Sequence, residues 1–87
     1  MMYRSLKPMG CEVILRALAT VSGVEGVGRT SAAVHLFTRH GDEFAAWRIF
    51  TTIDGTCVKK AGGSAGFYDE TVREKINEII EALRNAK

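Results

Sequence analysis

The sequence predicts an α+β protein, a two-layer αβββα sandwich with both helices on one face of a three-stranded antiparallel meander. The first observation is that apolar residues recur at helical spacing in the segments 9–22 and 69–86. The second is that residues 34–60 alternate between apolar and polar positions and are interrupted by Gly41-Asp42 and Asp54-Gly55, pairs typical of tight hairpin turns. Helices that each bury one stripe need a shared apolar sheet face, which leads to two layers.

The N-terminal part of the chain is expected to be an arm followed by a helix. Residues 1–8 carry no periodic pattern and are expected to form a loose arm. From about Met9 to Ser22 the apolar residues form one helical stripe: Cys11, Ile14, Leu15, Leu18 and Val21. Gly23 is well placed to end this helix, and the glycine-rich segment 22–31 is expected to be a loop.

The two turns predict how the strands pair. A loop at Gly41-Asp42 pairs His40 with Glu43, and a loop at Asp54-Gly55 pairs Ile53 with Thr56. Both pairings place the same set of residues on one face, and a slip of one residue would expose the whole set. We therefore expect this face to pack against the helices: Val34, Leu36, Thr38, Ala45, Trp47, Ile49, Thr51, Ile53, Thr56 and Val58.

The C-terminal part is expected to be a second glycine-rich loop over residues 61–68, followed by a helix from Asp69 to Ala86. Asp69 can cap the first turn of that helix. The apolar stripe of the helix consists of Val72, Ile76, Ile79, Ile80 and Leu83.

The opposite face of the sheet mixes aromatic and cationic side chains, and no element is left to cover it. It consists of Ala33, His35, Phe37, Arg39, Phe44, Ala46, Arg48, Phe50, Thr52, Cys57 and Lys59. Seven of these are the candidate interaction residues: His35, Phe37, Arg39, Phe44, Arg48, Phe50 and Lys59. An apolar patch with three phenylalanines favours a protein partner, either a second copy or another protein. Two alternatives stay open: nucleic acid, with bases stacked on the rings, or cover by a helix or by the arm.

A second candidate site is a possible anion-binding loop formed by Lys60, Gly62, Gly63 and Ser64. Glycines that lead into a helix N-terminus let an anion approach free backbone N–H groups. The segment lacks the spacing of known phosphate loops, so a plain strand-to-helix connection is the competing interpretation.

Length and composition indicate one small domain over residues 1–87. The 87 residues are 46% hydrophobic and 25% charged, with a formal net charge of +2, which does not by itself indicate a nucleic-acid partner. His35 and Cys57 lie on different outer strands of the expected sheet, so they cannot share a proton, and we expect no catalytic, cofactor or metal site. Two cysteines, no signal sequence and no membrane-spanning segment predict a cytoplasmic protein without a membrane partner. The predicted function is therefore a non-enzymatic module that self-associates or binds another protein through the outer face of the sheet. The alternative is a nucleic-acid-binding module that uses the same face and the glycine loop after Lys59 and Lys60. An enzyme or small-ligand binder whose site forms only between subunits stays open as a third possibility.

Overall fold

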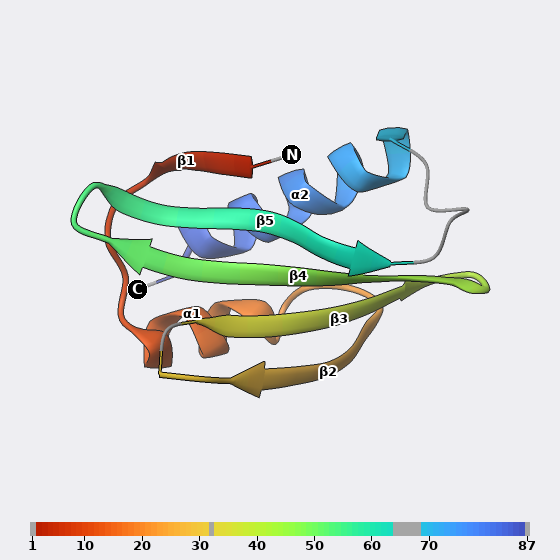
Figure 1. The fold of residues 1–87 in the computed structure, drawn as a ribbon, viewed down its shortest axis with the longest axis horizontal. Helices are drawn as coiled ribbons and strands as arrows, with labels where there is room; N and C mark the ends of the chain where they lie inside the picture. The colour runs from red at the N-terminus through yellow and green to blue at the C-terminus, as the bar shows by residue number, and fades with distance from the viewer. Residues whose placement is uncertain (1, 32, 64–68, 87) are drawn as a thin grey trace.

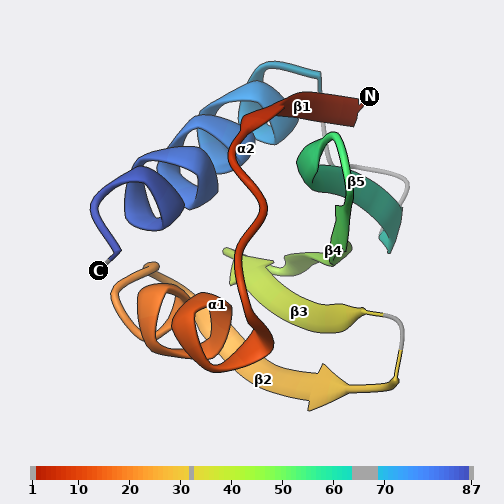
Figure 2. The ribbon, with the colours of Figure 1, turned by 90° about the vertical axis from the view of Figure 1, so that its left-hand side faces the viewer.

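The computed structural model describes residues 2–31, 33–63 and 69–86 and shows a sheet covered by helices on one face (Figures 1 and 2). The elements in chain order are β1 (Met2–Leu6), α1 (Cys11–Leu18), β2 (Val24–Arg29), β3 (Val34–His40), β4 (Glu43–Thr52), β5 (Gly55–Gly63) and α2 (Asp69–Arg84). Strands β2 to β5 follow one another as an antiparallel meander, and β1 joins it beside β5, so the sheet order is β1-β5-β4-β3-β2. The α+β class and the placement of both helices on one face agree with the sequence-based expectation.

The expected three-stranded sheet is wrong, because two more strands extend it. Strand β2 occupies most of the segment expected to be a loop, and its glycines pair with β3, Gly26 opposite Phe37 and Gly28 opposite His35. Strand β1 replaces most of the expected loose arm, with its Met2 opposite Lys59 of β5. The arm therefore adds a strand to the edge of the sheet.

The β3–β4 hairpin has the predicted pairing. His40 lies opposite Glu43 and Leu36 opposite Trp47. Gly41 has a φ of 64°, the left-handed value that the first central residue of a type II′ turn needs.

The β4–β5 hairpin differs from the prediction by two residues. Its turn is Ile53-Asp54, flanked by the pair Thr52 and Gly55. Since side chains alternate with a period of two, this shift leaves each residue on its predicted face. Ile53 is the exception, because it becomes a turn residue that is 94% exposed.

The core lies between the sheet and the two helices. The predicted stripe of α2 is buried throughout, and α1 contributes Ile14, Ala17 and Leu18. Helix α1 ends at Leu18, earlier than expected, and Gly23 lies in the connection to β2, where its carbonyl accepts a hydrogen bond from the Arg39 amide. Trp47 is fully buried, as its position in the pattern predicts, and its Nε1 donates a 2.8 Å hydrogen bond to Thr38 Oγ1.

Candidate interaction face on the outer side of the sheet

The face of the sheet that points away from the helices, called here the outer face, carries the seven predicted interaction residues. Cross-strand pairing brings these residues together from β3, β4 and β5. Phe37, Arg39, Phe44, Arg48 and Lys59 are exposed, and His35 and Phe50 are partly buried. Neither helix covers this side of the sheet (Figure 2).

A row of residues across the strands, called here the small-residue row, forms the centre of the outer face. It consists of Gly26, Phe37, Ala46 and Gly62. Phe37 is 46% exposed and lies opposite Gly26 on one side and Ala46 on the other. Ala46 in turn lies opposite Gly62. A Cβ atom added at Gly26 or Gly62 would meet nothing within 4 Å, so Phe37 stands beside open space. A partner that carries the same pattern can place its own ring in the shallow hollows beside Phe37.

At the β3–β4 turn side of that row, a second exposed ring lies next to a neutralised cation. Phe44 is 55% exposed and lies opposite Arg39. The Arg39 guanidinium forms an ion pair with Glu25, the extra residue in a bulge of β2. Hydrogen bonding to Glu25, and then its negative charge, raise the pKa of Arg39 above the ordinary value. The positive charge of Arg39 is therefore balanced within the chain.

On the other side of the small-residue row lies a row of basic side chains, called here the basic row. Arg48 on β4 has His35 opposite it on β3 and Lys59 opposite it on β5. The guanidinium of Arg48 lies over the ring of Phe50, 5.5 Å from its centroid, a cation–π arrangement. The outer face is thus apolar at its centre and positively charged on one side.

Two residues expected to be exposed on this face are buried instead. Ala33 is 3% exposed and Cys57 is not exposed at all. Cys57 lies opposite Phe50 on the same face, and Phe50 itself is only partly exposed. The expected patch of three exposed phenylalanines is therefore reduced to Phe37 and Phe44.

Most of the predicted anion-binding loop lies in a strand. Lys60, Gly62 and Gly63 belong to β5, where Gly62 and Gly63 lie opposite Ala46 and Ala45 of β4. Their backbone groups on the β4 side are paired within the sheet, whereas the pairs of β5 with β1 run only from Thr56 to Lys59, so anion binding by this segment stays a prediction. Ser64 lies outside the described residues.

The sequence gives no sign of a polar cluster that joins the end of the α1–β2 connection to α2. Lys75 is 8% exposed, and its Nζ donates to Glu78 Oε1 at 2.6 Å and to Ser22 O at 2.8 Å. The Ser22 amide donates to Glu78 Oε2 at 2.8 Å. Partial burial alone would raise the pKa of Glu78, but the hydrogen bonds from Lys75 and Ser22 outweigh it and lower that pKa.

This cluster does not have the arrangement of a catalytic serine and lysine. Lys75 Nζ donates to Ser22 Oγ at 3.2 Å and to Glu78 Oε1 at 2.6 Å, so in both contacts it is a hydrogen-bond donor and not a base that accepts the serine proton. The hydroxyl of Ser22 donates to Glu78 Oε1 at 3.0 Å rather than to a base. The contacts are those of a structural tie between two segments. No local sequence pattern indicates this tie, because Ser22 and Lys75 are far apart in the sequence and only the fold brings them together.

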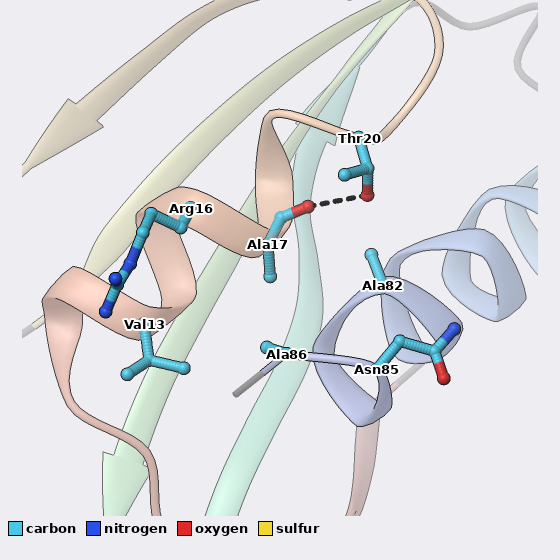
Figure 3. Close-up of a pocket in the computed structure, with 7 residues that line it drawn as sticks. All are labelled: Val13, Arg16, Ala17, Thr20, Ala82, Asn85 and Ala86. Carbon is cyan, nitrogen blue, oxygen red and sulfur yellow. Dashed lines mark hydrogen bonds between the residues drawn. The ribbon is translucent and has the colours of Figure 1, made fainter.

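A cleft of about 370 Å³ lies between α1 and α2 (Figure 3). Its walls are mostly alanine and valine, and the hydroxyl of Thr20 donates to the Ala17 carbonyl at 2.8 Å. The side chains of Arg16 and Asn85 point away from each other (Figure 3). The cleft therefore lacks the converging polar groups that orient a bound small molecule.

Within residues 2–31, 33–63 and 69–86, no three His, Cys, Asp or Glu side chains gather in a way that could hold a metal ion. In the same described ranges, neither helix is long and apolar enough to cross a membrane.

Comparisons with known protein families, with curated proteins and with solved structures found no match. The function is therefore inferred from the residues of the outer face themselves.

Proposed function

We propose that this protein is a non-enzymatic interaction domain that binds a second copy of itself through the outer face. The observation that carries the proposal is the pair of exposed rings, Phe37 and Phe44, on the side of the sheet that neither helix covers. Arg39, the cation beside them, is already neutralised by Glu25, so an apolar partner does not have to strip an unpaired charge of water.

The exposed rings supply enough apolar area for a weak dimer. A phenylalanine buries about 150–250 Å² when fully covered, so covering the exposed half of each ring removes about 100 Å² from water. At about 25 cal/mol per Å², four rings in a symmetric dimer contribute about 10 kcal/mol. Association itself costs about 4–15 kcal/mol, so the net gain is at most about 6 kcal/mol and we expect dissociation constants of about 40 μM or weaker.

The proposal is tested by the molar mass in solution. Light scattering after size exclusion, from about 10 to about 500 μM, should show a concentration-dependent shift from monomer to dimer. Phe37→Glu should give a monomer throughout, because it places a charge at the centre of the interface. A wild-type protein that stays monomeric at high micromolar concentration would contradict the proposal.

Val27→Glu is the matched control. Val27 is 43% exposed, nearly the same as the 46% of Phe37, but it lies opposite the buried Leu36 and so on the helix side of the sheet. We expect this variant to dimerise like the wild type. Loss of the dimer in both variants would mean that a general destabilisation, and not the outer face, is responsible.

A nucleic-acid-binding function is the second candidate, and the basic row favours it. Arg48 and Lys59 lie side by side, next to the Phe50 ring, and such cations can neutralise phosphates while rings stack on bases. Binding of single- or double-stranded probes should then weaken steeply with salt, and the double variant Arg48→Ala/Lys59→Ala should reduce the slope by about one to two units. Retardation of a probe by a protein that remains monomeric would favour this function over self-association.

We also propose that the protein acts in the cytoplasm. Cys11 and Cys57 are both free thiols, as expected in a reducing compartment. Localisation of a tagged protein by fluorescence microscopy tests this directly, and an extracellular signal would contradict it.

A further inference from the structure

We infer that the two-fold axis of the dimer runs across the strands, along the small-residue row, so that the strands of the two copies are antiparallel across the interface. This inference rests on the proposed self-association and adds the geometry of the complex. Its basis is the order of three rows on the outer face. The small-residue row lies in the middle, the basic row lies two residues to one side, and the pair Arg39 and Phe44 lies two residues to the other side.

An axis that ran along the strands would bring like charges together. In that arrangement each row faces its own copy, so Arg48 on the central strand β4 lies against Arg48 of the partner subunit. Since β4 is central among the strands that carry the face, its residues would lie nearest the axis. The attraction between the rings would then be opposed by two desolvated guanidinium groups at short distance.

An axis across the strands avoids this conflict and creates opposite pairings. Rotation about the small-residue row exchanges the two flanking rows, so Arg48 lies against Phe44 of the partner subunit. The guanidinium of Arg48 is already held over one ring, that of Phe50, and a second ring on its other side extends the same cation–π arrangement.

Strands β2 and β3 fit this axis as well. His35 comes to lie near the Arg39–Glu25 ion pair of the partner subunit, where the carboxylate of Glu25 can accept a hydrogen bond from the imidazole. Gly28, opposite His35 on β2, has only the His35 Cβ within 4 Å of an added Cβ, so space remains for that ion pair. Along the axis itself Phe37 meets Phe37 of the partner subunit beside the open space at Gly26.

The available area agrees with a second copy bound weakly. Strands β2 to β5 carry the small-residue row, and at about 4.8 Å between strands and about 6.7 Å between rows they give a face of about 19 by 20 Å, or about 400 Å². Two such faces bury about 800 Å², which is below the standard size of a stable protein interface and suits a weak dimer. The sheet curves around the helices, so its outer face is convex and two copies would touch mainly through the central strands (Figure 2).

The direction of the axis can be measured as a distance between two spin labels. Ile53 is a suitable site because it is 94% exposed in the β4–β5 turn and seven residues from Ala46 on the axis. A Cys11→Ser/Ile53→Cys variant carries one reactive thiol, since Cys57 is fully buried. With the axis across the strands, the two turns lie at opposite ends of the dimer, about 46 Å apart at about 3.3 Å per residue.

Double electron–electron resonance on the labelled dimer distinguishes the outcomes. A distance near 46 Å supports the inferred axis. A distance below about 25 Å would place both turns at the same end, with the sheets about 10 Å apart, and would overturn the axis while leaving self-association intact. The absence of any dipolar signal from a protein that is monomeric by light scattering would overturn the proposed function itself.

Arg48→Gln gives an independent test whose sign depends on the axis. If Arg48 contacts Phe44 of the partner subunit, removing its charge weakens the dimer by about fivefold or more, because two cation–π contacts are lost. If Arg48 faces its own copy, the same change relieves repulsion and tightens the dimer, which would overturn the inference. Sedimentation equilibrium of the variant and the wild type measures the change.

Discussion

The hydrogen bond between Trp47 and Thr38 is the most sharply testable feature of the core. Both side chains are almost completely buried, and the bond from Trp47 Nε1 to Thr38 Oγ1 is 2.8 Å long. Thr38→Val keeps the shape of the side chain but removes the acceptor. Trp47→Phe keeps an aromatic ring but removes the donor and leaves a cavity.

The expected costs follow from burial. Thr38→Val leaves a buried N–H without this acceptor, which costs about 1–3 kcal/mol. Trp47→Phe should cost about 2–4 kcal/mol, because it adds the loss of packing to the loss of the bond. In the double variant both partners of the bond are gone, so the total cost should fall short of the sum by about 1 kcal/mol or more.

The free energy of unfolding of all four proteins can be compared by urea titration followed by circular dichroism at far-ultraviolet wavelengths. Fluorescence is unsuitable, because Trp47 is the only tryptophan. At about 0.05–0.15 kcal/mol per residue the wild type has only about 4–13 kcal/mol of stability, so each single change should lower the midpoint visibly. Additive costs in the double variant would refute an energetic role for the bond. A Trp47→Phe protein as stable as the wild type would refute the burial itself.

Three further changes test other parts of the fold. Because the pKa of Glu78 is lowered in the folded state, the contribution of this carboxylate to stability is present above the ordinary pKa of 4.5 and is lost as the pH falls through the folded value. Glu78→Gln should therefore remove this part of the acid dependence of the free energy of unfolding, as measured by urea titrations at several pH values. Lys75→Met should lower the free energy of unfolding by about 1–2 kcal/mol, since it leaves a partly exposed carboxylate without its partner, and an unchanged urea midpoint would argue against the tie. Gly55→Ala should destabilise the fold by more than about 1 kcal/mol, because φ is 147° and the new Cβ would lie 2.3 Å from the Leu6 carbonyl oxygen. Gly62→Ala is the control, since its Cβ meets open space, and thermal unfolding should show a smaller loss of stability for it.

Alternation and turn chemistry predicted the centre of the sheet because both are local. The β3–β4 pairing follows from a glycine at the first central position of the turn, and Trp47 is buried where the alternation places it. The β4–β5 turn was misplaced because Asp-Gly is normally central in such turns, whereas Gly55 here accepts its left-handed φ as the first residue of β5. The misplaced turn did not change which residues were assigned to the outer face, since a shift of two residues does not exchange the two faces.

The two edge strands could not be predicted because neither carries a strand-like pattern. Gly26 and Gly28 reduce the intrinsic strand preference of β2, which is formed by pairing with β3 and not by its own composition. β1 depends on a partner more than fifty residues further along the chain, Lys59 opposite Met2. The apparent loop at Gly62 and Gly63 is strand for a similar reason, since β4 is long enough to pair with them.

The position of β1 beside β5 imposes an order on folding. Strands β2 to β5 are joined by short connections, so each can pair with its predecessor as soon as both exist. Pairing Met2 with Lys59 instead closes a loop of most of the chain, whose entropic cost is met only after much of the sheet is in place. We therefore expect β1 to join last and to detach first, with its amide hydrogens exchanging with solvent ahead of those in β3 and β4. In a nascent chain the edge of β5 stays open until that moment, and it is the place where an extended segment of another molecule could pair in place of β1.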